Sequence, residues 1–262
     1  MNILLRADLK RLFKGKALYI LMGVAAFFAT FSTLVIALVV NVFQGIEGSE
    51  QIKQLLAPLP LYVSSFSVLN NIGLALLITV TIIAVGDFSH ATIRNKLIAG
   101  HKREHIFFSS LISNLLFMLL VLIVYSGLTY VFASAVTSFT LDSFLDVLRY
   151  ALIGFSGYLV LYTLLTVTMF KFKNAWAPLL FIIGGVILLS LITFIVGIIL
   201  NALNVTLNLL PYFIPIAVLS DINFLVASKG LDHFYIFTLV NILYVTLLVI
   251  LGRSVAIKTD FK

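Results

Sequence analysis

The chain has 262 residues, of which 62% are hydrophobic and only 10% are charged, and its formal net charge is +7 at pH 7. Soluble domains are about half apolar and about a quarter charged, so this composition excludes an ordinary globular core. The sequence contains no cysteine, which excludes a disulfide framework and thiolate chemistry. Apolar runs of about 20 residues are long enough to cross a bilayer and indicate a polytopic membrane protein.

The N-terminal segment, residues 1–16, predicts a helix that lies at the membrane interface. Apolar residues such as Ile3, Leu4 and Leu9 are interleaved with cations, and helical periodicity gathers part of the apolar set on one face. Such a helix suits the headgroup layer of a leaflet that carries anionic lipid. The alternative is a basic tail that only sets topology. The predicted membrane-interface cations are Arg6, Lys10, Arg11 and Lys14.

Six transmembrane spans are predicted from the apolar runs that follow. None of these runs contains Asp, Glu, Lys or Arg. Ionisable residues at bilayer depth usually mark ion sites, proton relays or catalysis, so the composition of the spans disfavours a proton-coupled carrier and an intramembrane enzyme. The predicted spans are 17–40, 61–85, 106–135, 150–170, 178–200 and 233–251.

Polar and small residues inside the spans are interpreted as helix-packing residues. Gly154 with Gly157, and Gly184 with Gly185, allow close approach of neighbouring helices. Contact with a transported molecule is the alternative role for the polar set. These polar residues are Asn70, Asn71, Thr79, Thr81, Asn114, Ser126, Thr163, Thr166, Thr168 and Asn241.

A basic island separates the second and third spans, at residues 87–105. It predicts a short helix that Ser89 or Thr92 caps and Gly100 ends. Ile93 and Leu97 form a narrow apolar ridge on this helix, with Ile98 beside it. A helix this short is marginal alone, so docking to another surface must stabilise it. The alternative is a plain basic loop, and the spacing of His90, His101 and His105 does not favour a metal site.

The segment at 201–232 predicts a re-entrant pair of short helices on the external side. It is strongly apolar around Pro211 and Pro215, too short for two more spans and too apolar for a solvated loop.

The distribution of charge predicts that both termini and the basic island face the cytoplasm. Lys53, Arg149 and Lys229 alone fall on the other side, together with six of the ten acidic residues. This asymmetry also explains the positive net charge without nucleic-acid binding. The cations assigned to the cytoplasmic side are Arg6, Lys10, Arg11, Lys14, Lys16, Arg94, Lys96, Lys102, Arg103, Lys171, Lys173, Arg253, Lys258 and Lys262.

The order of these segments resembles the ABC-2 type permeases of ATP-binding cassette exporters. In that family an acidic residue, a Gly-Thr pair, a basic residue, a leucine and a later glycine mark the coupling helix, which inserts into a groove of the cytoplasmic ATPase. Ala91 stands where the family commonly has glycine, and "LPYFIPI" is similar to the family's re-entrant segment. The coupling residues implied are Asp87, Thr92, Ile93, Arg94, Lys96, Leu97, Ile98 and Gly100.

The resemblance implies one permease domain over residues 1–262, acting as the transmembrane subunit of an ATP-driven exporter. Its partners would be ABC ATPase subunits and a second permease copy or paralogue, in the plasma membrane of a bacterium. The single Gly-Lys pair, Gly15-Lys16, lacks the upstream glycine of a phosphate-binding loop. We therefore expect this chain to be no enzyme and to hold no cofactor, with ATP and Mg²⁺ bound by the partner ATPase.

The uncharged spans imply a hydrophobic or amphipathic cargo, such as a membrane-active peptide, a lipid-linked molecule or a drug. Two alternatives stay open. The chain could be a membrane scaffold for immunity or assembly that transports nothing, or, with less support, an intramembrane enzyme.

Overall fold

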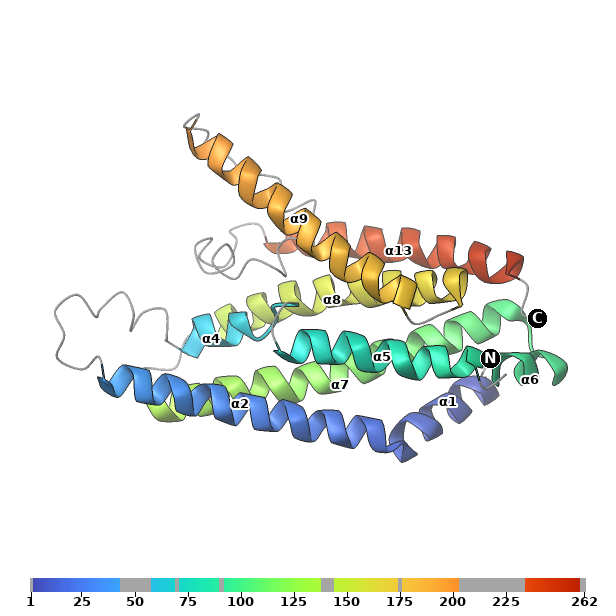
Figure 1. Cartoon of the computed structure of the whole chain (residues 1–262), viewed down its shortest axis with the longest axis horizontal. Coiled ribbons are helices and arrows are strands. Elements are labelled where there is room, and N and C mark those ends of the chain that lie inside the picture. Colours follow the sequence, from blue (N-terminus) through green and yellow to red (C-terminus); the bar gives the residue numbers. More distant parts are fainter. Residues whose placement is uncertain are drawn as a thin grey trace.

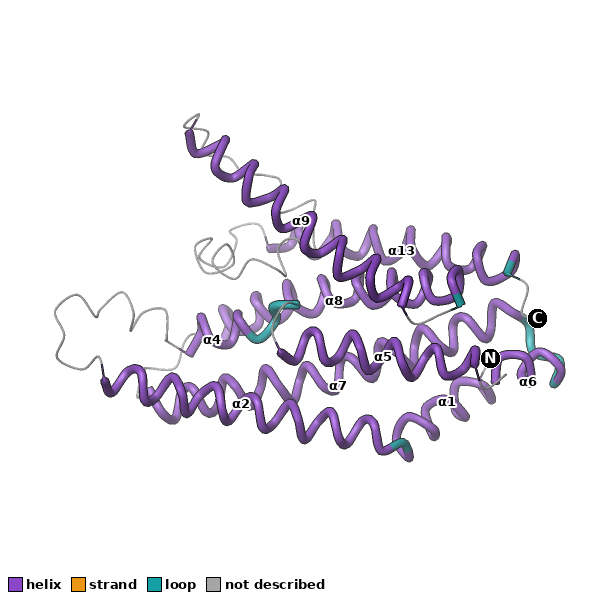
Figure 2. Tube along the Cα trace, in the orientation of Figure 1, coloured by secondary structure: helices purple, strands orange, loops and turns teal. Residues whose placement is uncertain are grey.

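The computed structural model describes residues 2–42, 58–68, 71–89, 92–137, 144–173, 176–202 and 234–259. Within these ranges every regular element is a helix, as the predicted all-α class requires. Figures 1 and 2 show most of the long helices side by side, with α9 crossing the others obliquely. The helices are α1 (Asn2–Lys14), α2 (Lys16–Val42), α4 (Pro58–Ser64), α5 (Asn71–Ser89), α6 (Thr92–Ile98), α7 (Arg103–Thr137), α8 (Phe144–Phe172), α9 (Trp176–Ala202) and α13 (Phe234–Lys258).

Several of these helices are long and apolar enough to cross a membrane. Two more helices, α5 and α9, carry shorter apolar stretches among the described residues, at Ile72–Ile83 and Trp176–Ile192. The chain is thus a helical protein with candidate membrane spans, and the full set of six remains a prediction. The four candidate spans are Lys16–Val35 in α2, Arg103–Ala135 in α7, Leu145–Phe172 in α8 and Phe234–Lys258 in α13.

The second predicted span, 61–85, is wrong as one continuous helix, because α4 ends at Ser64 and α5 begins at Asn71. The Oγ atoms of Ser64 and Ser65 donate to the carbonyl oxygens of Leu61 and Tyr62, at 2.8 and 2.6 Å. The N–H of Ser67 then bonds to the carbonyl of Ser64, three residues back. Serine hydroxyls that compete for backbone partners favour turns over helix continuation. The serine cluster therefore divides the span.

The remaining predicted spans each fall on a helix. The longest is α7 with 35 residues, and α13 runs to Lys258, past the predicted end at residue 251. Of the predicted re-entrant segment, 201–232, only Asn201 and Ala202 are described, as the last residues of α9. The rest of that prediction lies outside the described residues.

Helix α8 is the most deeply buried of the four candidate spans, and it contacts α4, α5, α7, α9 and α13. Tyr158 and Tyr162 on α8 are fully buried, with their rings 6.2 Å apart. Phe66, from the turn after α4, packs edge-on against Phe155. Helix α2 packs against α7. The main hydrophobic core therefore surrounds α8 and the inner face of α7.

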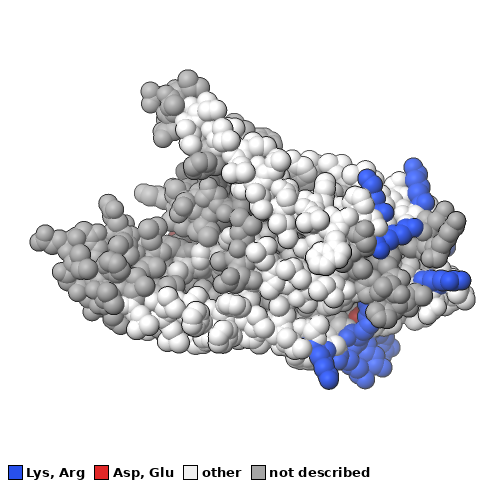
Figure 3. Space-filling model, in the orientation of Figure 1, with Lys and Arg blue, Asp and Glu red and all other residues white. Residues whose placement is uncertain are grey.

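One end of the bundle collects most of the described positive charge. Figure 3 shows Lys and Arg gathered there, and Figure 1 places both chain termini, α1 and α6 at the same end. We call it the charged end. Arg149 is the exception, since it lies near the start of α8 with its guanidinium 5.8 Å from the centre of the Phe234 ring. This agrees with the sequence pattern, which separated Arg149 from the other cations.

Gly154 and Gly252 each lie in close contact with an aromatic ring, whereas Gly184 and Gly185 do not. A Cβ on Gly154 would lie 2.4 Å from the Phe66 ring, and one on Gly252 would lie 2.3 Å from the Phe107 ring. The packing role predicted for Gly154 is therefore confirmed. At Gly184 and Gly185 an added Cβ would meet no described atom within 4 Å.

Two of the predicted polar packing contacts join neighbouring helices. Asn114 Nδ2 donates to Thr166 Oγ1 at 3.3 Å, between α7 and α8, and Asn241 Nδ2 donates to Ser156 Oγ at 2.8 Å, between α13 and α8. Most of the threonine hydroxyls instead donate to a carbonyl one turn back in their own helix, as Thr81 does. The side chains of Asn70 and Asn71 lie outside the described residues.

Gly154→Ala should lower the free energy of unfolding by about 1–3 kcal/mol, because the new methyl group must displace the buried Phe66 ring. Gly184→Ala is the matched control, since it adds the same methyl group to a helix where nothing is in contact. Thermal unfolding of the purified chain in detergent measures both. Equal unfolding temperatures for the two variants would contradict the close packing at Gly154.

Candidate functional site

The short helix α6 ends in a hydrogen-bonded glycine cap at the charged end. The N–H of His101 bonds to the carbonyl of Lys96 at 3.2 Å, and the N–H of Gly100 bonds to that of Leu97 at 2.9 Å. Gly100 has a φ of 84°, in the left-handed region that favours glycine. This pair of bonds is the Schellman motif, and it confirms that Gly100 ends the helix.

The apolar ridge of α6 packs against the same chain. Ile93 is only 4% exposed and belongs to a buried hydrophobic cluster. Leu97 packs against this cluster. We call this group the α6 docking cluster. It joins α6 to α1, α7, α8 and α13, so the docking surface that the short helix needs is provided within the chain. The buried members are Leu4, Ile93, Ile106, Phe107, Leu111, Val167, Phe170 and Ala256.

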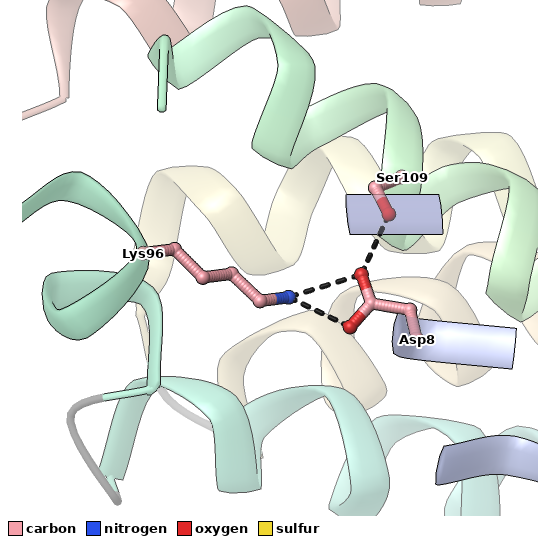
Figure 4. A network of polar contacts seen from close by, with 3 residues as sticks. All are labelled: Asp8, Lys96 and Ser109. Atoms are coloured by element: carbon pink, nitrogen blue, oxygen red, sulfur yellow. Dashed lines mark hydrogen bonds and ion pairs between the residues drawn. The ribbon is translucent and has the colours of Figure 1, made fainter. Parts of the chain in front are cut away.

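A buried carboxylate connects α1, α6 and α7 beside this cluster (Figure 4). Lys96 Nζ on α6 donates to both carboxylate oxygens of Asp8 on α1, at 2.8 and 3.0 Å. Ser109 Oγ on α7 donates to Asp8 Oδ2 at 2.6 Å. The side chains of Lys96 and Asp8 are only 13% and 6% exposed. One carboxylate on α1 thus joins two helices whose contacting residues lie 88 and 101 positions away in the sequence.

Because this ion pair is buried, the stability of the fold depends on both of its partners. Taking a carboxylate and an ammonium group out of water is costly unless each finds its partner with good geometry. Asp8 accepts three hydrogen bonds here, all from donors that depend on the docked position of α6 and α7. Removing one partner would leave the other charge buried and unpaired, which is strongly destabilising. The network therefore favours one position of α6 against α1.

A second, more exposed ion pair ties the start of α7 to the end of α13. Arg253 Nε and Nη2 both lie 2.9 Å from Glu104 Oε2. Arg103 Nη1 also donates to the carbonyl of Ile257 at 2.7 Å. Since exposed pairs contribute little, these contacts mainly fix the direction of the C-terminal turns of α13. The charged end is thus a connected unit of α1, α6, α7 and α13.

The structure divides the predicted coupling residues between two faces of α6. Ile93, Lys96 and Leu97 turn toward the chain, where they make the contacts described above. The opposite face is exposed at Arg94 and Asn95, and Ile98 is 75% exposed. Ile93 is therefore a contact within the chain rather than an outward one, because the cluster encloses it. The outward face of α6 thus presents the cation of Arg94, the amide of Asn95 and the apolar side chain of Ile98.

Two predicted features of the segment are only partly visible. Asp87 lies in the last turns of α5, but its side chain is outside the described residues. Thr92 is the first residue of α6 and Ser89 is the last residue of α5, and the cap predicted at one of them stays a prediction. Among the residues that the structure describes, no group of three or more His, Asp or Glu could hold a metal ion.

Helix α1 forms as predicted and separates from α2 at Gly15. The predicted interface cations Arg6, Lys10, Arg11 and Lys14 are all exposed, whereas Leu4 is buried in the α6 docking cluster. Ile3 is 78% exposed and Phe13 is 47% exposed. Helix α1 therefore directs part of its apolar face to the protein and leaves other apolar side chains outward. The interfacial position of α1 stays a prediction.

Sequence reasoning missed Asp8 and Ser109, which complete the network. A signal was present for Asp8, because it is the only acidic residue among the first 16 residues, where five are Lys or Arg. An acidic residue in this segment weakens its attraction to anionic lipid, so its presence indicates a role within the protein. No comparable signal marked Ser109, which is one serine of several at the start of α7.

Asp8→Asn should loosen the docking of α6, because Lys96 would then be buried opposite a neutral group. We expect faster amide hydrogen exchange in residues 92–105 and a loss of about 3 kcal/mol in the free energy of unfolding. Asp146→Asn is the matched control, since it removes the same charge from an exposed pair with Arg149. The exchanged pair, Asp8→Lys with Lys96→Asp, should recover part of the loss. Unchanged exchange in Asp8→Asn would show that the network does not hold α6.

No protein-family model, no curated protein and no solved structure matches this chain. Its function must therefore be inferred from the residues and geometry of the charged end.

Proposed function

We propose that this chain is the transmembrane subunit of an ATP-driven ABC exporter, and that α6 is the helix through which an ATPase acts on it. The observation that supports this proposal best is the form of α6. It is a capped helix of 7 residues at the charged end, fixed to its own chain on one face and open on the other. A helix that only connected two spans would not need both the apolar dock and a buried ion pair.

The outward face of α6 suits a protein partner. Ile98 stands four residues after Arg94 and three after Asn95, so it shares one side of the helix with each of them. An exposed isoleucine between polar groups can enter an apolar pocket, while the cation and the amide supply orientation. In the ABC-2 permeases that the segment resembles, this position contacts the ATPase. The inner residues Ile93, Lys96 and Leu97 would then transmit force instead of touching the motor.

The proposed mechanism is alternating access in a dimer of permease subunits. Closure of two bound ATPases would push α6, and the push would reach α7 through the α6 docking cluster and through the contact of Ser109 with Asp8. Helix α5 precedes α6 directly and would move with it. The cargo path would lie between the two subunits, and the uncharged spans suit a hydrophobic or amphipathic cargo. Six spans, cytoplasmic termini and a bacterial plasma membrane belong to this proposal.

Ile98→Asp should reduce cargo-stimulated ATP turnover by about tenfold or more in liposomes that hold this chain and its ATPase. The reason is that a carboxylate in place of Ile98 cannot enter an apolar pocket without a large desolvation cost. Ile3→Asp is the matched control, because Ile3 is 78% exposed at the same end of the molecule but lies on α1, whereas Ile98 is 75% exposed on α6.

The same assay separates a transporter from a scaffold that only binds an ATPase. A transporter should show turnover that depends on cargo and falls in Ile98→Asp, whereas a scaffold should show none that depends on cargo. Normal turnover in Ile98→Asp, with the ATPase still bound, would refute the role of α6. Ile93→Asp is unsuitable for this test, since Ile93 is buried and its loss would disturb folding.

A further inference from the structure

A cavity of about 340 Å³ lies inside the bend between α1 and α2. Gly15 forms this bend, and its N–H bonds to the carbonyl of Leu12 at 3.3 Å. The far wall of the cavity comes from α5, α6 and α7. Its volume falls at the lower end of the range for small-molecule sites, about 300–1,000 Å³. It can therefore hold the head of an amphiphile and the first part of a chain, but not a whole lipid.

The polar part of the lining is suited to an anion. Arg11 and Lys16 both line the cavity, and both are exposed, as expected for side chains at its mouth. Asp8 also lines it, but Lys96 and Ser109 already bind its carboxylate. Among the described lining residues, Arg11 and Lys16 are the cations, and the carboxylate of Asp8 is already bound by Lys96. The hydroxyl group of Ser113, which is 9% exposed, adds a donor deeper in the cavity.

The remaining lining is apolar and selects against a small free anion. Leu18, Val80 and Phe117 are buried side chains that line the cavity, from α2, α5 and α7. Inorganic phosphate would gain nothing from these side chains, whereas an acyl chain would gain by burial there. The candidate span of α2 begins at Lys16, so this cavity lies where the apolar part of the molecule begins. In a bilayer that level is the boundary between headgroups and acyl chains.

We propose that this cavity binds an anionic glycerophospholipid, with its phosphate between Arg11 and Lys16 and the proximal part of one acyl chain against Leu18, Val80 and Phe117. A zwitterionic lipid fits less well, because its ammonium group would meet two cations. The bound lipid bridges α1, α2 and α7, and therefore holds the bend at Gly15. The proposal of this site does not depend on the proposed role of α6 in transport.

The test uses the intact chain in detergent, with native mass spectrometry to count bound dihexanoyl phosphatidylglycerol as its concentration rises. Lys16→Gln should weaken the tightest binding event by about tenfold, as expected for the loss of one charged contact to phosphate. Lys14→Gln is the matched control. It removes the same charge two residues away, from an exposed side chain that does not line the cavity.

Two further arms fix the chemistry of the ligand. Dihexanoyl phosphatidylcholine should bind at least about tenfold more weakly than the phosphatidylglycerol, and inorganic phosphate should show no saturable binding. Ser113→Leu, which fills the cavity from α7, should abolish the tight event while thermal unfolding confirms a folded chain. Equal weakening by Lys16→Gln and Lys14→Gln would place the lipid on the surface and overturn the site. Saturation by inorganic phosphate, or equal binding of both lipids, would overturn the assignment to an anionic lipid.

Discussion

The charged end of this protein depends on the buried carboxylate of Asp8. Asp8 leaves water when α1 packs on the bundle, and its charge must then be balanced within the protein. Lys96 and Ser109 provide that balance with three short hydrogen bonds, and they come from α6 and α7. Because each donor stands on a different helix, the carboxylate is satisfied only when all three helices are in place. Polar requirements of this kind select one arrangement, whereas apolar packing alone would tolerate several.

The hydrophobic contacts beside the network give it strength. The α6 docking cluster unites side chains from five helices around Ile93 and Phe107, and Phe107 in turn packs closely on Gly252. Helix α6 is too short to be stable by itself, so nearly all of its stability must come from these neighbours. A force applied to the outward face of α6 would accordingly move α7 and α13 instead of only bending α6. This property is what the proposed coupling role requires.

The apolar bundle is held together by a different principle. Its helices meet through shape, as the Phe66 ring against Gly154 shows, and through the two amide contacts of Asn114 and Asn241. In a membrane the hydrophobic effect does not drive helices together, so close packing and a few interhelical hydrogen bonds must do so. The outer faces of α2, α9 and α13 carry large exposed apolar side chains, which suits contact with lipid or with a second subunit.

Much of the architecture could be predicted from local sequence. Long uncharged apolar runs specify helices wherever no water can satisfy the backbone, and a glycine with a left-handed φ ends α6 where the pattern placed the end. The sequence also grouped the described cations correctly (Figure 3), with Arg149 apart from the rest, because charge at the ends of spans is a local property, whereas the side of the membrane that they face stays a prediction. It failed at 61–85, where the hydroxyls of Ser64 and Ser65 turn the chain within an apolar run.

Tertiary structure alone decided what each residue of the candidate site contacts. Ile93 and Ile98 are the same residue type on one short helix, yet one is enclosed by the chain and the other is open. The sequence implied a coupling role for Lys96, but only the fold brought Asp8 to it across 88 positions of sequence. Local patterns fix which face of a helix is apolar, but they do not fix what that face meets. That depends on distant segments whose approach is determined by burial and charge pairing over the whole bundle.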